Sequence, residues 1–130
     1  MPGYSSALIV GTGPGLSASL ARLFTREGMR VALAARNTDK LAALAAETKA
    51  ATFACDATDA AQVSKLFQDV ERANGSPDVV VYNASARARG PVAELAPADV
   101  QRAIQISAFG GFLVSQEAAK RMLPKGHGAI

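Results

Sequence analysis

Three glycines near the amino terminus are the first residues whose spacing suggests ligand chemistry. Gly11, Gly13 and Gly15 follow the apolar run 7–10, and leucine and phenylalanine residues spaced as on one helix face come after them. A glycine turn between a strand and a helix leaves backbone N–H groups free, and these groups and the helix dipole attract an anion. The stretch therefore predicts a phosphate-binding turn of a dinucleotide site.

The spacing of these glycines is not the commonest one for such a turn. In Gly-x-Gly-x-x-Gly the third glycine would fall on Leu16, whereas Gly-x-x-x-Gly-x-Gly fits if Ser17 replaces the last glycine. We expect Ser17 to loosen the packing of the helix on the strand slightly, and Pro14 removes one N–H donor. The alternative is a tight strand-to-helix corner that needs glycine only for a positive φ. The other residues of the chain must distinguish a phosphate-binding turn from such a corner.

The residue after the second apolar run bears on the choice of cofactor. Arg36 lies about 20 residues beyond the glycine turn, where an acidic residue would bind the ribose hydroxyls of NAD and an arginine accommodates the 2′-phosphate of NADP. Ala34 and Ala35 before it carry no charge. Arg36 therefore favours NADP(H) over NAD(H); the alternative is a surface arginine. The nearby Asp39 is better explained as a helix cap.

Two further polar residues follow predicted strands. Asp56 could accept a hydrogen bond from the adenine amino group, with Ala57 leaving room for the ring, or it could cap its own loop. Asn83 begins a run of small residues, 83–86, that would let a cofactor lie close to the backbone. Its side chain could tie neighbouring strand ends together or form an ordinary Asx turn. Cys55 is interpreted as a small buried hydrophobic residue.

These residues need a scaffold of alternating strands and helices. Apolar runs predict strands, and helical spacing with capping residues predicts the helices between them. A short lead-in, residues 1–4, precedes the first strand. The predicted strands are 6–10, 30–35, 51–55 and 78–82, and residues 129–130 begin a fifth. The predicted helices are 15–26, one after capping residues 37–39, one capped by Asp59, and a long helix over 97–122.

The order of the elements predicts an α/β fold in one domain, residues 1–130. Strands that are apolar throughout indicate a parallel sheet covered on both faces. Right-handed crossovers favour a doubly wound sheet in the order 3-2-1-4, with the start of strand 5 beyond the fourth. The glycine turn, Arg36, Asp56 and Asn83 all follow strands, so they meet at the carboxyl edge, where such sheets bind ligands.

Composition narrows the classes of function. The chain has 130 residues and a net charge of +3, and its Lys and Arg residues are scattered, so we expect no nucleic-acid partner. It contains no apolar run near the ~18 residues of a membrane span and no secretory signal pattern. One cysteine suits a reducing cytoplasm, and one cysteine with one histidine argues against a zinc site.

Taken together, these features resemble the short-chain dehydrogenase/reductase family. Gly11–Ser17 is similar to its glycine turn, 35–37 to its NADP-preferring strand ending, Asp56 to its adenine-binding aspartate, and 82–85 to its Asn-Asn-Ala-Gly motif. The resemblance implies a Rossmann fold, NADP as cofactor, hydride transfer between nicotinamide and an alcohol or carbonyl substrate, and dimers or tetramers formed through the long helix. The predicted cofactor-binding residues are Gly11, Thr12, Gly13, Gly15, Leu16, Arg36, Asp56, Ala57, Asn83, Ala84 and Ser85.

The chain departs from this family at its catalytic positions. Ser107 stands where the family usually has an asparagine, and we interpret it as a small helix-packing residue. The family's catalytic serine and Tyr-x-x-x-Lys follow the fifth strand. Here Tyr4 and Tyr82 are followed four residues later by Leu8 and Ala86, so we predict no catalytic residue in this chain. We expect the amino-terminal part of a longer oxidoreductase, inactive by itself, that aggregates or fails to fold when expressed alone.

Two other functions are compatible with a glycine turn after the first strand. A methyltransferase usually needs an acidic residue after strand two, and Arg36 argues against that class. A non-catalytic dinucleotide-sensing regulator would keep the fold without the chemistry, and Ser17, Ser85 and Ser107 allow this reading. Finding Tyr-x-x-x-Lys after residue 130 would favour the oxidoreductase over the regulator.

Overall fold

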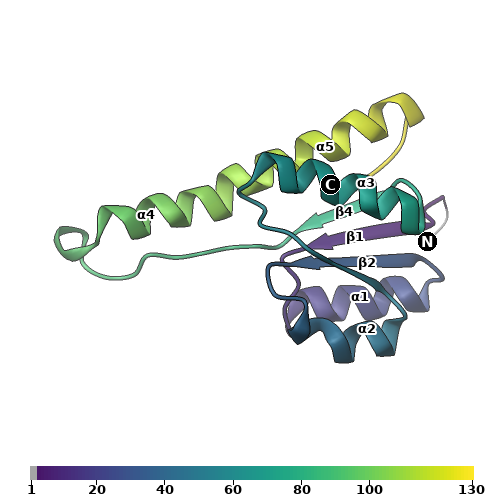
Figure 1. Cartoon of the computed structure of the whole chain (residues 1–130), viewed down its shortest axis with the longest axis horizontal. Coiled ribbons are helices and arrows are strands. Elements are labelled where there is room, and N and C mark those ends of the chain that lie inside the picture. The colour runs from purple at the N-terminus through teal and green to yellow at the C-terminus, as the bar shows by residue number, and fades with distance from the viewer. Residues whose placement is uncertain (1–2) are drawn as a thin grey trace.

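A computed structural model shows a four-stranded parallel sheet with helices on both faces (Figure 1). It describes residues 3–130, so residues 1 and 2 of the predicted lead-in lie outside the described residues. The strands are β1 (Ser6–Val10), β2 (Arg30–Ala35), β3 (Ala51–Ala54) and β4 (Val79–Tyr82). Their order is β3-β2-β1-β4, which confirms the predicted doubly wound sheet.

The register of the sheet brings the strand ends level with one another. Val10 of β1 pairs with Ala34 of β2 on one side and with Tyr82 of β4 on the other. β3 ends one residue earlier than predicted, although the N–H of Cys55 still donates to the carbonyl of Ala35 at 3.1 Å. The residues that follow each strand therefore meet at the same edge.

The two ends of the described chain meet beside β4. Ala129 forms a parallel bridge with Val79, on the outer side of β4 where a fifth strand is predicted to begin. One residue before this bridge, the carboxylate of Asp78 accepts hydrogen bonds from the N–H of Ser5 at 2.7 Å and from Nζ of Lys125 at 3.0 Å. Asp78 thus joins the start of the chain to its last helix.

Two separate cores lie on the two faces of the sheet. Alternate residues of β1 point to opposite faces, so Leu8 and Val10 pack under one pair of helices while Ala7 and Ile9 pack under the other. α1 (Leu16–Arg26) and α2 (Ala42–Thr48) cover the second face, and α3 (Ala60–Asn74) and α5 (Gly110–Lys125) cover the first (Figure 1). The strands are buried on both faces, as continuous apolar runs require.

Of the predicted capping residues 37–39 and Asp59, Asn37 and Asp59 supply side-chain oxygens to backbone N–H groups. The carboxylate of Asp59 accepts hydrogen bonds from the N–H groups of Ala61 and Gln62 and so begins α3. Asp39 is not a cap, because it lies inside a short 3₁₀ turn, Asp39–Leu41, that precedes α2. The backbone N–H of Asp39 instead donates a hydrogen bond to the side-chain oxygen of Asn37 at 3.0 Å.

The predicted long helix is interrupted and ends later than expected. α4 (Pro97–Ile104) continues through a π turn, Gln105–Phe109, into α5. Pro124 lies inside α5 and does not end it. The helix ends at Lys125, because Gly126 adopts the left-handed conformation that terminates helices. Residues 84–109 project beyond the sheet (Figure 1) and are called the arm; they include a 3₁₀ turn at Val92–Glu94.

Among residues 3–130, no helix combines the length and the apolar character needed to cross a bilayer. Within the same range, no three or more His, Cys, Asp or Glu residues gather as a metal site would require.

Candidate cofactor site

A cavity of about 580 Å³ opens at the carboxyl edge of the sheet. It lies between the ends of the strands and the base of the arm. Nine of the eleven predicted cofactor-binding residues are among its eighteen lining residues. Those predicted residues are Gly11, Thr12, Gly13, Arg36, Asp56, Ala57, Asn83, Ala84 and Ser85.

Gly15 and Leu16 lie at the start of α1, outside this lining. Gly15 is the residue before the helix, no side chain caps it, and Leu16 is 62% exposed. A Cβ added to Gly13 or Gly15 would meet no atom within 4 Å, so nothing inside the protein fills the space over the turn. This open turn at a bare helix N-terminus has the form that a pyrophosphate requires.

Gly11 is required by the fold itself. Its φ is +85°, and an added Cβ would lie 2.3 Å from the backbone nitrogen of Ala84. The first glycine therefore satisfies the need for a positive φ and lets the β1 turn approach the end of β4. Thr12 is buried, and its hydroxyl donates to the carbonyl of Ile9 at 3.1 Å, which fixes the turn from within.

Ser17 joins three elements around the cavity. Its hydroxyl donates to the carbonyl of Gly11 at 3.2 Å and accepts a hydrogen bond from the side-chain amide of Asn83 at 2.9 Å. The residue is 1% exposed, so its side chain lies fully buried between these elements. Asn83 also donates its backbone N–H to the carbonyl of Val10 at 2.8 Å and, as predicted, ties neighbouring elements together.

Asp56 has one of the two roles considered for it, the cap of its own loop, and it also faces the cavity. Its carboxylate accepts hydrogen bonds from the hydroxyl of Thr58 at 2.7 Å and from the N–H of Thr58 at 3.0 Å, so it caps its own loop. It also lines the cavity. These two hydrogen bonds lower the pKa of Asp56, and the positive charges of Arg36 and Arg102 lower it further. The carboxylate is therefore ionised at neutral pH and able to accept a hydrogen bond from a ligand.

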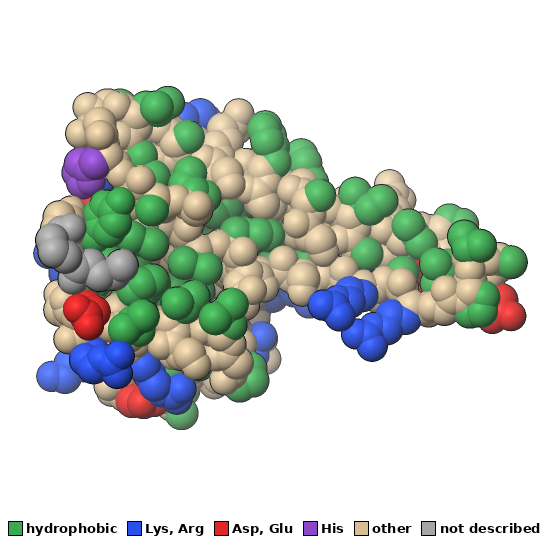
Figure 2. Space-filling view, turned by 180° about the vertical axis from the view of Figure 1, so that it is seen from behind, with side chains coloured by type: hydrophobic (Ala, Val, Ile, Leu, Met, Phe, Trp, Pro, Cys, Tyr) green, Lys and Arg blue, Asp and Glu red, His purple; other side chains and the backbone are tan. Residues whose placement is uncertain are grey.

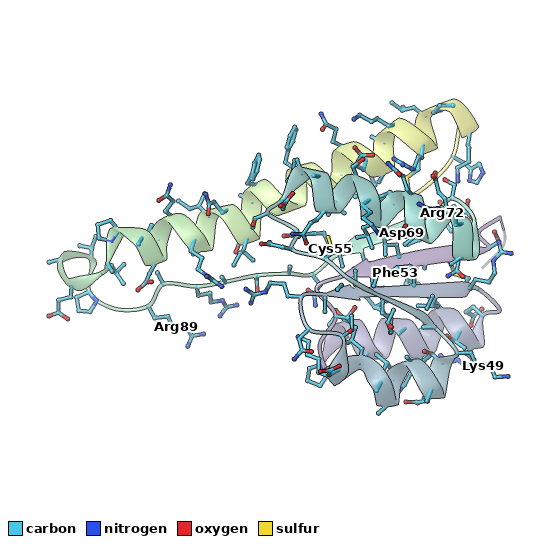
Figure 3. The ribbon with its side chains drawn as sticks, in the orientation of Figure 1. Lys49, Phe53, Cys55, Asp69, Arg72 and Arg89 are labelled. Atoms are coloured by element: carbon cyan, nitrogen blue, oxygen red, sulfur yellow. The ribbon has the colours of Figure 1, made fainter. Side chains whose placement is uncertain are left out.

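Arg36 and Cys55 lie beside this carboxylate and differ in chemistry. Arg36 is exposed and forms no salt bridge among the described residues, so its guanidinium is available to an anion. Cys55 is buried as predicted, at the end of β3 (Figure 3). Burial, with the nearby charges of Asp56 and Asp59, raises the pKa of its thiol to about 11. The thiol is therefore protonated and weakly nucleophilic at neutral pH.

The arm supplies a wall of the cavity that sequence reasoning missed. Arg102 and Ile106 line it from α4 and the π turn. The Tyr82 hydroxyl donates to the carbonyl of Ile106, and burial raises the pKa of this phenol. The residues between β4 and α4 show neither a helical nor a strand periodicity. The sequence therefore does not predict which face of α4 lies toward the ends of the strands.

Ser107 is not a helix-packing residue, and that interpretation is corrected. Its side chain is exposed, and its hydroxyl accepts from the N–H of Ala86 and donates to the carbonyl of Ala86, both at 3.1 Å. These two bonds fasten the π turn to the loop that follows β4.

The sheet order, the glycine turn and the polar strand ends around one cavity define a Rossmann-type α/β fold. The family model of the short chain dehydrogenases matches residues 5–130, and the chain belongs to this family.

Similar proteins include several dehydrogenases. D-Threitol dehydrogenase of Mycolicibacterium smegmatis is 34% identical over 129 residues, which are 95% of this chain and 50% of that protein. Gluconate 5-dehydrogenase of Gluconobacter oxydans is 31% identical with the same coverage. Among solved structures, a variant of actinorhodin polyketide ketoreductase with NADPH has a TM-score of 0.91 and 29% identity, covering 96% of this chain and 51% of that one. The chain spans about half the length of these relatives.

Proposed function

We propose that residues 1–130 form the NADP(H)-binding part of a short-chain oxidoreductase. The observation that carries this proposal is Arg36, at the end of β2 and in the same cavity as the glycine turn and Asp56. Its guanidinium has no salt-bridge partner within residues 3–130. When bound, the nicotinamide ring supplies or accepts a hydride, and the substrate would be an alcohol or a carbonyl compound. The protein's contribution from these residues is to bind and orient the cofactor.

The residues present fit the pyrophosphate, the 2′-phosphate and the adenine of such a cofactor. The open turn around Gly13 and Gly15 would hold the pyrophosphate. Arg36 would bind the 2′-phosphate, and Asp56 would accept a hydrogen bond from the adenine amino group. Thr12, Leu16, Ala57, Ala84 and Ser85 complete the proposed contacts.

Relatives do not decide between NADP and NAD. A similar ketoreductase structure contains NADPH, whereas a 35% identical relative from Sphingomonas is named as an NAD(+) dehydrogenase. The preference for NADP(H) therefore rests on the charge at the end of β2. No observation favours a regulator, and membership of the dehydrogenase family leaves the methyltransferase hypothesis without support.

The proposal assigns no proton transfer to these residues. Neither Tyr4 nor Tyr82 belongs to a Tyr-x-x-x-Lys sequence. We propose that the full-length protein supplies these groups elsewhere, works in the cytoplasm, and forms dimers or tetramers through the helix that contains α4 and α5. A chain of residues 1–130 alone would then catalyse no hydride transfer.

The test is a calorimetric titration of the full-length protein with NADPH and NADH. We expect NADPH to bind more tightly, and Arg36→Asp to reverse the preference by about 1–3 kcal/mol, the range of a charged hydrogen bond. Arg30→Asp is the matched control, because Arg30 is an exposed arginine at the opposite end of the same strand. Equal affinities for the two cofactors in the unmutated protein would refute the NADP assignment.

A further inference from the structure

Arg102 is a cation in the cavity wall that the proposed cofactor contacts leave unused. It lies on α4, four residues before Ile106, so the two side chains share one face of the helical segment. Both line the cavity, on the arm side, while Arg36 and Asp56 line it from the strand ends. The arm therefore directs one apolar and one guanidinium side chain toward the space between them.

The helical segment that carries Arg102 is fastened to the sheet. The Tyr82 hydroxyl donates to the carbonyl of Ile106, and Ser107 forms two hydrogen bonds with the backbone of Ala86. A Cβ on Gly110 would lie 2.2 Å from the Tyr82 hydroxyl, so the glycine permits this close approach. The position of Arg102 over the cavity is thus set by contacts on the carboxyl-terminal side of α4.

The guanidinium itself is free to meet a ligand. Arg102 is exposed, and its side chain forms no hydrogen bond or salt bridge among the described residues. Its charge nevertheless contributes to the lowered pKa of Asp56, which places it in the electrostatic neighbourhood of that carboxylate. A part of a ligand that is hydrogen-bonded to Asp56 would therefore lie near the guanidinium of Arg102.

We propose that Arg102 covers the adenine ring of the bound dinucleotide, stacking its guanidinium on the ring while Asp56 holds the ring's edge. This inference rests on the proposed function. Arginine suits the task, because its planar and weakly hydrated guanidinium stacks on aromatic faces. Ile106 offers an apolar surface beside it. Since NADP and NAD share the adenine ring, Arg102 contributes to the affinity for both, whereas Arg36 decides between them.

The experiment is calorimetric titration of full-length Arg102→Ala with NADPH, NADH, 5′-AMP and nicotinamide mononucleotide. We expect both dinucleotides and 5′-AMP to bind about threefold to thirtyfold more weakly, and nicotinamide mononucleotide to be unaffected. Arg102→Lys keeps the charge without the planar group and should recover only part of the loss. Arg89→Ala is the matched control, because Arg89 lies on the loop of the same arm (Figure 3) and outside the cavity lining.

Each outcome separates this inference from the function on which it rests. A loss confined to NADPH would place Arg102 at the 2′-phosphate and overturn the adenine assignment. Full recovery by Arg102→Lys, or no loss in Arg102→Ala, would overturn it as well. If the unmutated protein bound neither dinucleotide, the proposed function itself would fail. Melting temperatures measured without ligand show whether each variant remains folded, and alanine is a good helix former at this position.

Discussion

At the scale of single residues, Ser17 shows how a departure from a motif can add structure. A glycine at this position would have no side chain to join the first turn to Asn83. The serine hydroxyl bonds both the carbonyl of Gly11 and the amide of Asn83, so it fixes the glycine turn relative to the end of β4. The altered motif is therefore a more tightly connected version of the turn.

Removing that hydroxyl tests its role. We expect Ser17→Ala to lower the free energy of unfolding by about 1–2 kcal/mol, because two hydrogen bonds are lost, and to weaken NADPH binding, because the turn loosens. Urea denaturation and cofactor titration measure the two effects. Ser19→Ala is the control, since Ser19 is exposed on the same helix. Equal stability of the two variants would contradict the prediction.

Asp78 makes the stability of the folded protein depend on pH. Burial of this carboxyl would raise its pKa, but hydrogen bonds from Ser5 and Lys125 outweigh burial and lower the pKa to about 2. A pKa lowered in the folded state contributes stability that is present above the unfolded value of about 4 and is lost as the pH falls toward 2. At neutral pH this contribution is on the order of 2 kcal/mol.

We therefore expect Asp78→Asn to be less stable than the unmutated protein at pH 6, and the difference to shrink as the pH falls from 4 to 2. Urea denaturation at a series of pH values measures it. A difference that stays constant across this range would show that the charge of Asp78 is not its cause.

At the scale of elements, the close contact between β4 and α5 depends on a glycine, Gly110, in α5. A Cβ on Gly110 would lie 2.2 Å from the Tyr82 hydroxyl and 3.1 Å from the carbonyl oxygen of Ala57. At the neighbouring Gly111 the nearest atoms of Tyr82 would be 3.4 and 3.5 Å away, which is ordinary van der Waals contact. Adjacent glycines thus differ in what they tolerate.

We expect Gly110→Ala to destabilise the protein by about 1–3 kcal/mol through overpacking. Gly111→Ala should be neutral or stabilising, because alanine is the better helix former. Adding Tyr82→Phe to Gly110→Ala removes the nearest clashing atom, so the double variant should cost less than the sum of the single ones. Thermal denaturation of the unmutated protein, the three single variants and the double variant checks this order, and additive effects would show that the hydroxyl is not the obstacle.

The same scale explains which parts of the site the sequence predicts. Arg36, Asp56 and Asn83 are predictable, because each directly follows an apolar strand and parallel strands end at one edge. The bond between Ser17 and Asn83 is not, because it joins residues far apart in sequence whose side-chain directions depend on packing. Arg102 and Ile106 are missed for a related reason. They lie in α4 and in the π turn, which follow an irregular loop. The π turn also changes which face of α4 is aligned with which face of α5, so the helical period of the sequence does not carry across it.

At the scale of the whole molecule, an apolar surface runs along the arm and into α5 (Figure 2). Ile104, Phe109 and Phe112 are 59%, 47% and 56% exposed, and the two phenylalanine rings stack with centroids 6.3 Å apart. Exposed apolar surface of this kind favours association.

A chain of residues 1–130 expressed alone should therefore self-associate. Replacing Phe109 and Phe112 with glutamine should reduce the apparent mass at a given concentration, as measured by size-exclusion chromatography with light scattering. Leu123→Gln is the control, since Leu123 is 78% exposed on the far part of α5. A monomeric unmutated chain that unfolds reversibly would contradict the prediction.

The central position of β1 also governs the order in which the protein can be built. β1 pairs with β2 from residue 30 onward, but its other edge pairs with β4, which begins at residue 79. During synthesis, one edge of a strand that is entirely buried in the folded protein therefore remains unpaired until most of the chain has emerged from the ribosome. Such late pairings of distant segments slow folding and leave the nascent chain prone to association. The strand that leads into the glycine turn is thus among the first to be synthesised and among the last to be fully paired.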